Sequence, residues 1–513
     1  MMPHFLFIGV IALLAGTNVQ AQTKRPNMLF FLTDDLDLEL GSMMKPLVRT
    51  RMLIGDSGVT FANAYVTTPL CCPSRSSILT GLYAHNTGVS NNSLSGGCSS
   101  RGWQRGPERS AFAVDLQRSG YETFYAGKYL NRYGHRRAGG VQHVPPGWTN
   151  WNGLVGNSVY YNYTLSVNGT AEKHGDSPNK DYLTDVLRAK ALSFLESRVD
   201  QRRPFFMMLS TPSPHAPFTP AVRHRDAFPN LKAPRTPAFN ISVNGTKHWL
   251  VRQAIHPIPE DVVSWIDETY RNRLRTLLSV DDMVADVLSY LDSKQLLNNT
   301  YVFFTSDNGY HLGQYSMPKD KRHPYETDIH VPLLVRGPGI IAGREEQGVA
   351  LNVDLAPTFL DLAGLPSRGD MDGVSLKPLL VGDASRGNRP RQSFLVEYEG
   401  EGDEQERPGK CPVLQGMSGC DPDVECECQD SKNNTYLCTR QISAEANTKL
   451  CAFDDEESFV ESYNLTEDPY ELKNLFLSDD DAFRRYDGRM CLNELRFCRR
   501  ESCYVDCWRS SSR

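Results

Sequence analysis

Short, continuous apolar runs separated by longer amphipathic stretches restrict this chain to a few folds. Such runs are typical of strands that are buried on both faces of a sheet. They lie at residues 28–32, 205–209, 301–304 and 331–335. Stretches with helical periodicity lie between them, for example at residues 182–199 and 268–291. The alternation predicts an α/β domain with a large, mostly parallel central sheet flanked by helices.

Polar side chains follow several of these predicted strands, including a further one at residues 121–126. They are carboxylates, an amide, an imidazole and an ammonium group, at Asp34, Asp35, Lys128, His215, Asp307 and Asn308. In open α/β sheets, ligands bind beyond the carboxyl ends of the strands. The sequence therefore predicts one site to which all of these side chains contribute.

Two of the strand ends offer only oxygen ligands, the Asp34–Asp35 pair and the Asp307–Asn308 pair. Oxygen ligands suit calcium or magnesium better than zinc. Taken singly, the first pair could cap a helix, and the second could form a tight turn with Gly309. Both pairs at strand ends in one chain favour a metal site.

Residues 71–81 read Cys-Cys-Pro-Ser-Arg-Ser-Ser-Ile-Leu-Thr-Gly. Pro73 and Ser74 suit the start of a helix, which would place Cys71 at the positive end of a helix dipole. Taken alone, Cys-x-Pro could be a buried cysteine in a turn before a helix. The whole string, Cys-x-Pro-Ser-Arg followed after three residues by Leu-Thr-Gly, resembles the signature of the sulfatase family.

The resemblance implies an alkaline-phosphatase/sulfatase-like fold and a modified nucleophile. In that family the first cysteine of the motif, here Cys71, is oxidised to Cα-formylglycine (3-oxoalanine) by a formylglycine-generating enzyme during secretion. The hydrated aldehyde then attacks the sulfur of a sulfate ester. Arg75 stays charged and can hold that group.

The resemblance also implies roles for the residues at the strand ends. Together with the modified residue 71, the two oxygen pairs resemble the ligands of one calcium ion. Lys128 and Lys321 match lysines that reach the sulfate, although lysines are more often solvated surface charges. His215 matches a histidine that protonates the leaving alcohol. His311 and Arg322 are candidate substrate-binding residues.

One position departs from the family pattern. Many sulfatases have a histidine two residues after the first lysine, where this chain has Leu130. His311 is a candidate replacement for that base, and equally a residue that contacts substrate or plays only a local role.

Longer strings at residues 127–131, 247–250 and 463–469 resemble the branch of the family that removes 6-O-sulfate from N-acetylglucosamine residues of heparan sulfate and keratan sulfate. This implies a lysosomal, exo-acting enzyme with a sulfated glycosaminoglycan as substrate. Extracellular endosulfatases share much of the pattern, but they carry a long Lys/Arg-rich insert before the cysteine-rich tail. The corresponding stretch here, residues 400–410, is not basic, which favours exo action.

Two other classes fit less well. A phosphatase or phosphodiesterase of the related superfamily would normally need two transition metals held by several histidines, and no histidine lies within the two oxygen pairs. A non-catalytic glycan-binding descendant would have lost the nucleophile or a ligand, and all are present. The formal net charge of −6 gives no sign of nucleic-acid binding.

The N-terminus and the sequons predict entry into the secretory pathway. Residues 1–21 resemble a signal peptide, because an apolar run at residues 5–15 is followed by small residues at Val19 and Ala21. A membrane anchor is the alternative, but the run is too short to span a bilayer. No later run reaches eighteen apolar residues, so no membrane anchor is expected. We expect the lysosome as destination, with secretion from the cell as the alternative. Eight Asn-x-Ser/Thr sequons occur, at Asn91, Asn162, Asn168, Asn240, Asn244, Asn298, Asn433 and Asn464.

Ten of the thirteen cysteines lie between Cys411 and Cys507. This predicts a smaller disulfide-rich C-terminal subdomain at residues 394–513, after a catalytic domain at residues 22–393. Without Cys71, twelve cysteines remain and could all pair, in combinations that the spacing leaves open. A zinc site at Cys426-x-Cys428 is the alternative, and an oxidising compartment favours disulfides.

Overall fold

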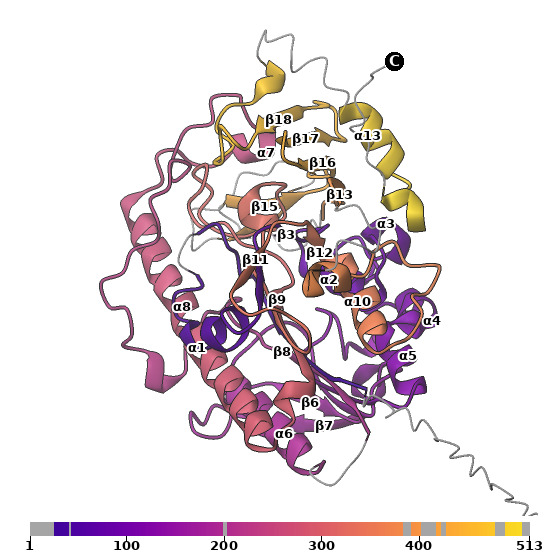
Figure 1. The fold of residues 1–513 in the computed structure, drawn as a ribbon. Coiled ribbons are helices and arrows are strands. Elements are labelled where there is room, and N and C mark those ends of the chain that lie inside the picture. Colours follow the sequence, from indigo (N-terminus) through magenta and orange to yellow (C-terminus); the bar gives the residue numbers. More distant parts are fainter. Residues whose placement is uncertain are drawn as a thin grey trace, which may run out of the picture.

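A ten-stranded mixed sheet runs through the centre of the molecule (Figure 1). The computed structural model describes residues 25–40, 43–198, 203–382, 391–401, 417–421, 427–477 and 488–504, so the predicted signal peptide lies outside the described residues. In spatial order the strands are β11 (Arg344–Glu346), β2 (Val59–Phe61), β10 (Leu333–Arg336), β9 (Thr300–Ser306), β1 (Asn27–Thr33), β8 (Phe205–Ser210), β4 (Glu122–Lys128), β5 (Asn150–Leu154), β6 (Thr164–Val167) and β7 (Thr170–Lys173).

The five neighbouring strands β9, β1, β8, β4 and β5 are all parallel, as the sequence predicts. Strand β1 lies at the centre, where Phe30 pairs with Met208 of β8 and with Phe303 of β9. Strands β10, β6 and β7 join antiparallel to their neighbours toward the edges. The carboxyl ends of the five parallel strands therefore meet at one edge of the sheet.

Each apolar run is continuous because each strand is buried on both faces. On β1, Leu29 and Phe31 belong to one hydrophobic cluster, whereas Met28 and Phe30 belong to a second cluster on the opposite face. Successive side chains of a strand point to opposite faces, so both sets must be apolar. Truncating one of these large side chains, for example Phe31, would cost about 3–5 kcal/mol of stability.

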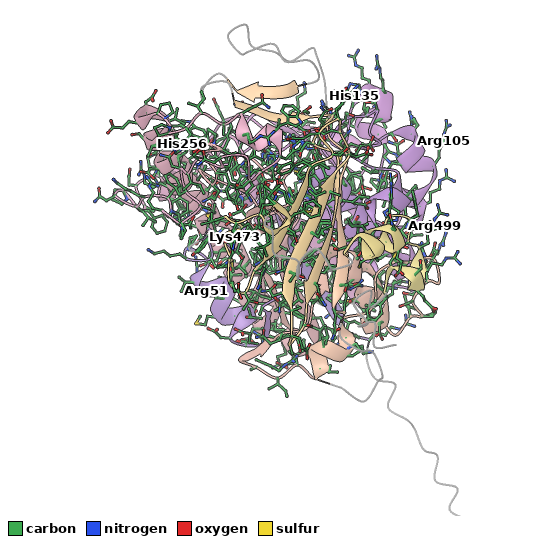
Figure 2. The ribbon with its side chains drawn as sticks, turned by 90° about the horizontal axis from the view of Figure 1, so that it is seen from above. Arg51, Arg105, His135, His256, Lys473 and Arg499 are labelled. Carbon is green, nitrogen blue, oxygen red and sulfur yellow. A yellow bond between two sulfur atoms is a disulfide. The ribbon has the colours of Figure 1, made fainter. Side chains whose placement is uncertain are left out.

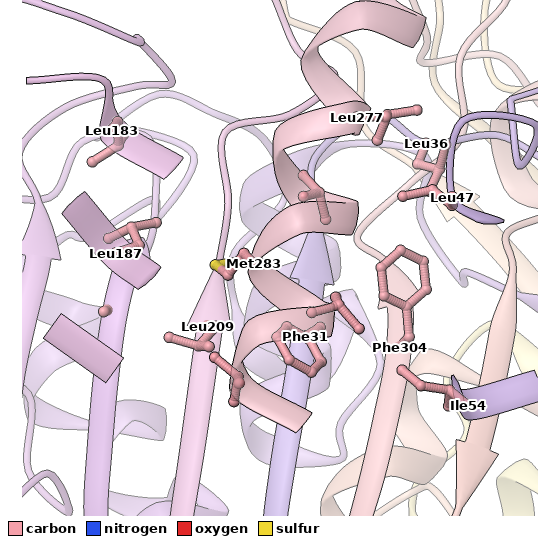
Figure 3. Packing of buried hydrophobic residues seen from close by; sticks show 14 of the residues in the cluster. Phe31, Leu36, Leu47, Ile54, Leu183, Leu187, Leu209, Leu277, Met283 and Phe304 are labelled. Carbon is pink, nitrogen blue, oxygen red and sulfur yellow. The ribbon is translucent and has the colours of Figure 1, made fainter. Parts of the chain in front are cut away.

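Helices cover both faces of the sheet (Figure 1). The first cluster packs α6 (Leu183–Glu196) and α8 (Glu260–Ser293) on the sheet, and Figure 3 shows Leu277 and Met283 of α8 in this cluster together with Phe31 and Phe304. The second cluster packs α5 (Phe112–Arg118) and α10 (Leu355–Leu362) on the other face. Helix α8 begins at Glu260, eight residues before the predicted start, because Pro259 precedes it and two acidic residues occupy its first turn.

A smaller antiparallel sheet lies above the large one in Figure 1. Its strands are β13 (Ser393–Tyr398), β16 (Tyr436–Ile442), β17 (Asn447–Phe453) and β18 (Val460–Asn464). The hairpin β14 (Met417–Asp421) and β15 (Glu427–Ser431) and the helix α13 (Gly488–Leu495) belong to the same part of the chain. The disulfide Cys438–Cys451 joins β16 to β17, and Cys498–Cys503 follows α13. Cys411, Cys426 and Cys507 lie outside the described residues, as does most of the 400–410 stretch.

The small sheet packs on the rest of the molecule through a third hydrophobic cluster. Phe394 and Tyr436 of the small sheet meet Tyr65 and Tyr83 of the N-terminal part there. The remaining short elements are α1 (Val48–Thr50), β3 (Ala64–Tyr65), α2 (Cys71–Thr80), α3 (Ala84–Thr87), α4 (Arg101–Arg105), α7 (Trp249–Arg252), α9 (Glu326–Ile329), β12 (Ala350–Leu351) and α11 (Lys377–Val381).

Membrane-spanning helices and exposed basic side chains are two features that could indicate binding partners. Among the described residues, no helix combines the length and the apolar character needed to cross a membrane. Figure 2 labels six exposed arginine, lysine and histidine side chains at separate places on the molecule, namely Arg51, Arg105, His135, His256, Lys473 and Arg499.

Candidate active site

The predicted polar residues meet at the carboxyl edge of the parallel strands. Asp34 and Asp35 follow β1, and the backbone N–H of Asp34 donates to the carbonyl of Ser213, 2.9 Å away, in the loop after β8. The N–H of Asp307, after β9, donates to the carbonyl of Thr33 at 3.2 Å. These bonds hold three loops side by side, and the helix α2 points its first residue at them.

Cys71 is that first residue, and it is unpaired and fully buried. Its Sγ lies 3.6 Å from Oδ1 of Asp34. One ligand atom each from Asp34, Asp35, Cys71 and His215 falls within 4.8 Å of the others. The helix begins two residues before the predicted start, so Pro73 lies in its first turn, where its missing N–H costs nothing. The adjacent Cys72 forms a disulfide with Cys98, whereas Cys71 keeps a free thiol.

Burial raises the pKa of the Cys71 thiol to about 12, although Lys128 and Lys321 act in the opposite direction. Only the thiolate is a strong nucleophile. An unmodified Cys71 therefore stays protonated at neutral pH and is a poor nucleophile in this pocket.

Three buried cations neutralise three buried carboxylates in the site. Lys128 Nζ lies 2.6 Å from Asp34 Oδ2, and Lys321 Nζ lies 2.7 Å from Asp35 Oδ2. Arg75 Nε lies 2.7 Å from Asp307 Oδ2. Both lysines are buried, which excludes the interpretation that they are solvated surface charges.

Arg75 reaches the ends of four strands, because its Nε pairs with Asp307 after β9 and its other nitrogens face three more. Its Nη1 donates to the carbonyl of Lys128 at 2.9 Å and to Oγ of Ser210 at 2.7 Å. Its Nη2 lies 3.6 Å from Oδ1 of Asp34 and has no hydrogen-bond partner among the described residues. One donor of this fixed guanidinium thus remains for a ligand beside Asp34.

The carboxylates differ in their proton affinity. Burial alone would raise the pKa of Asp34, but Lys128, His215 and Arg75 hold it well below its ordinary value. Burial raises the pKa of Asp307 to about 7 in spite of the Arg75 partner. A further positive charge would be needed to keep all three carboxylates ionised.

The oxygen donors fit such a cation. Asn308 donates through Nδ2 to Oδ1 of Asp35, 2.7 Å away, and to the carbonyl of Gly309. This leaves its Oδ1 buried without a hydrogen-bond partner in the described structure. Asp35 has a positive φ of 66°, and its backbone N–H donates to Oδ1 of Asp307 at 3.1 Å. Carboxylate and amide oxygens are ligands for calcium or magnesium, so the residues present suit a hard cation.

His215 reaches this group from the loop after β8. Its Nδ1 donates to the carbonyl of Ala216 at 2.7 Å, which leaves Nε2 facing the acidic group, 3.8 Å from Asp35 Oδ2. Burial lowers the pKa of His215 to about 4. The ring therefore has a defined orientation, with Nε2 free to accept or donate a proton in the pocket.

The two candidate substrate-binding residues lie beside Lys321. The His311 ring places Nδ1 3.0 Å from Oδ1 of Asp328, and its backbone pairs with that of Asp320. The Arg322 guanidinium forms an ion pair with Asp320 and lies 3.7 Å from Oδ2 of Asp430. Within the described part of the chain, neither side chain forms a hydrogen bond or ion pair with Cys71 or with its acidic neighbours.

Two residues of the site have no counterpart in the sequence analysis. Ser158, after β5, donates its hydroxyl to Oδ2 of Asp34. Arg273, in the middle of α8, donates to the carbonyl of Asp35 at 2.8 Å and to Oδ2 of Asp37 at 3.0 Å. A serine in a loop and an arginine in an amphipathic helix match no motif, so only the tertiary structure reveals them.

A cavity of about 680 Å³ lies apart from this chemistry, between α3, the small sheet and α13. Its lining includes His85, Glu397, Phe453 and Phe497, and none of the residues predicted to be catalytic. The buried charged cluster, and not this cavity, therefore defines the candidate active site.

Comparisons with known proteins identify the family of this chain. A family profile described as "Sulfatase" matches residues 26–365. The chain is 50% identical over 477 residues to the N-acetylglucosamine-6-sulfatase of Homo sapiens, covering 92% of this chain and 85% of that protein. It is 43% identical over 386 residues to the extracellular sulfatase SULF-1 homolog of Drosophila melanogaster, covering 74% of this chain and 34% of that protein.

The fold also matches a solved structure, that of BT4656 in complex with its substrate D-glucosamine-2-N,6-O-disulfate. The TM-score is 0.71 at 25% identity, and the match covers 96% of this chain and 100% of that chain. The large mixed sheet with a small antiparallel C-terminal sheet is thus the alkaline-phosphatase/sulfatase-like fold expected from the sequence. On the profile match and the 50% identity together, this chain belongs to the sulfatase family.

Proposed function

We propose that this protein removes the 6-O-sulfate from N-acetylglucosamine 6-sulfate at the non-reducing ends of heparan sulfate and keratan sulfate. The observation that carries the proposal is the position of Cys71. It is a free cysteine at the start of α2, and its Sγ lies within 4.8 Å of ligand atoms of two aspartates and a histidine. Its neighbour Cys72 forms a disulfide and has no free thiol. The substrate follows the N-acetylglucosamine-6-sulfatase to which the chain is 50% identical.

Cys71 is the residue that a formylglycine-generating enzyme would convert in the secretory pathway. The aldehyde hydrate supplies the oxygen nucleophile that a thiol with a pKa of about 12 cannot provide at neutral pH. Arg75 would hold this hydrate through Nη2, the atom of its guanidinium that has no other hydrogen-bond partner among the described residues.

One calcium ion would be held by Asp34, Asp35, Asp307 and Asn308, with residue 71 beside them. When bound, it supplies a Lewis acid for the oxygens of the sulfate group. The unpartnered Oδ1 of Asn308 supports this ligand set. Ser158 and Arg273 would keep Asp34 and Asp35 in place through the hydrogen bonds they donate.

The remaining residues would act on the two ends of the scissile bond. Lys128 and Lys321 would neutralise charge on the sulfate oxygens, where preorganised cations in a dry site act most strongly. His215 would give a proton from Nε2 to the departing sugar oxygen. Because Nδ1 already donates to a carbonyl, that second proton makes the ring an imidazolium, which the anionic sulfate ester would stabilise against the burial that lowers its pKa. His311, whose backbone pairs with that of Asp320, and Arg322, which follows Lys321 in the chain, would contact the sugar.

The lysosome is the proposed site of action, reached through the secretory pathway. None of the eight sequon asparagines is buried, so each is open to a glycan. The disulfides Cys72–Cys98 and Cys438–Cys451 suit an oxidising compartment. Secretion from the cell is the alternative, and it accompanies an endosulfatase activity.

The test is sulfate release from two defined oligosaccharides. One carries 6-sulfated N-acetylglucosamine at its non-reducing end, and the other carries it only internally. We expect release from the terminal sugar alone. Release from the internal sugar would overturn the exo assignment in favour of the extracellular endosulfatase. No release from either would overturn the proposed substrate.

A further inference from the structure

The short segment that carries Lys321 has a strained backbone. Asp320 has φ of 119° and Arg322 has φ of 91°, and neither is a glycine. Such conformations cost about 1–3 kcal/mol each and persist only where the surroundings hold them. Between these two residues, Lys321 points its Nζ at Asp35 Oδ2, 2.7 Å away. The orientation of this lysine therefore depends on whatever holds its two neighbours.

The groups that hold the backbone come from the small C-terminal sheet and from the turn that leads into its strand β16. The carbonyl of Arg322 accepts a hydrogen bond from the Tyr436 hydroxyl at 3.0 Å and from Nδ2 of Asn434 at 3.3 Å. The carbonyl of Pro324 accepts from Nζ of Lys449 at 2.6 Å. All three donors are buried, so water does not compete with them.

Side chains that follow the segment are held from the same side. Glu326 forms ion pairs with Arg440 at 3.1 Å and with Lys449 at 3.0 Å. The Tyr325 hydroxyl donates to Glu461 at 3.1 Å. Arg440, Lys449 and Glu461 belong to β16, β17 and β18. Three adjacent strands of the small sheet therefore bind side chains of the segment that follows Lys321.

We propose that Tyr436, Asn434 and Lys449 are positioning residues for Lys321, which makes the small sheet part of the sulfate-binding machinery. The inference rests on the proposed role of Lys321 as a ligand of the sulfate group. It assigns to the small sheet a role in orienting a cation more than 100 residues earlier in the chain. A one-ångström displacement of such a group can cost about 10²-fold in rate.

A purely structural role would predict a different pattern. Thr439 lies on β16 with Tyr436, and its hydroxyl is buried without a hydrogen-bond partner among the described residues. Thr439→Val therefore removes a hydroxyl from the same strand without touching the Lys321 segment. Tyr436→Phe removes a hydroxyl that does touch it, and both replacements preserve the shape of the side chain.

The experiment measures binding of inorganic sulfate by calorimetry, in the full-length protein with Cys71→Ala and calcium present. We expect Tyr436→Phe to weaken sulfate binding about 5- to 10-fold, as for a lost hydrogen bond that sets geometry. Lys449→Met should weaken it as well, and Lys449→Arg should restore much of the affinity. Thr439→Val should bind sulfate like the parent protein. Chemical unfolding of each variant checks that it is folded.

Equal sulfate affinity in Tyr436→Phe and Thr439→Val would overturn the proposal. The same substitutions on the Cys71 background should lower kcat for N-acetylglucosamine 6-sulfate in the same order. If the unaltered protein fails to hydrolyse that sugar while the sulfate affinities still separate the variants, the proposed substrate is wrong and the positioning role stands.

Discussion

Lys128 places its Nζ 2.6 Å from Oδ2 of Asp34, and both side chains are fully buried. The lysine ends β4 and the aspartate follows β1, so this ion pair crosses the sheet edge at the centre of the site. Removing one partner of a buried pair leaves the other charge uncompensated in a medium of low dielectric constant. The pair therefore links the stability of the fold to the chemistry of the site.

Replacing Lys128 by methionine should impair both activity and stability. We expect kcat/KM to fall by about 10²–10³-fold, because a cation aimed at the sulfate is lost. The free energy of unfolding should fall by about 3 kcal/mol, measured by chemical denaturation. Lys190→Met is the control, because Lys190 pairs with Glu172 at 2.8 Å on the surface and should lose less than about 1 kcal/mol. Full activity in Lys128→Met would exclude Lys128 from the sulfate site.

A substitution at Asn308 tests the metal site through calcium binding, with no need to measure enzyme activity. Asn308→Leu removes the buried, unpartnered Oδ1 that would bind the cation. We expect the calcium concentration for half-maximal thermal stabilisation to rise at least about tenfold, as for the loss of a supporting ligand. Asn447→Leu is the control, because its Oδ1 is also unpartnered but lies on β17. If calcium stabilises both variants as it does the parent protein, Asn308 is not a ligand.

The surroundings of His330 should make part of the free energy of unfolding depend on pH. Its Nδ1 lies 2.6 Å from Glu39 Oε1 and its Nε2 lies 3.0 Å from the carbonyl of Ala62, so both nitrogens face acceptors. Burial opposes protonation, but Glu39 prevails and raises the pKa of His330 above its ordinary value of 6.5. A raised pKa stabilises the folded protein fully below pH 6.5, and this contribution is lost as the pH rises through the higher value.

The measurement is the free energy of unfolding between about pH 6 and pH 8. In the parent protein it should fall as the pH rises, and in His330→Gln it should fall less steeply. His135→Gln is the control, because His135 is exposed and, among the residues that the structure describes, its ring bonds only to the backbone of Arg137. The same slope in all three proteins would exclude His330 as the source of this dependence.

Much of the architecture could be predicted because burial dictates it. The strands β1, β8 and β9 coincide with continuous apolar runs, since each strand has a hydrophobic cluster on both faces. Side chains after these strands had to meet at one edge once the strands were parallel. Asp34 and His215 accordingly lie together, and Cys71, at the start of α2 and 37 residues after Asp34, joins them although it follows none of these strands.

Contacts made by packing alone could not be predicted. Arg273 supports Asp35 from the middle of α8, and in the sequence it is one more polar residue of an amphipathic helix. The hydrogen bond from the Tyr436 hydroxyl to the carbonyl of Arg322 joins residues 114 positions apart, and no sequence motif at either residue predicts it. The domain boundary predicted between residues 393 and 394 stays a prediction. The contacts between the two parts include those of Tyr436 and Lys449 with the Lys321 segment, which we propose to orient Lys321.

The most direct test of the account is sulfate release from N-acetylglucosamine 6-sulfate by the parent protein and by Cys71→Ala, with the mass of the peptide that contains residue 71. We predict an aldehyde at position 71 and repeated turnover in the parent protein, and a folded, inactive Cys71→Ala protein. Multiple turnover by Cys71→Ala, or by a parent protein whose Cys71 is unmodified, would contradict the account.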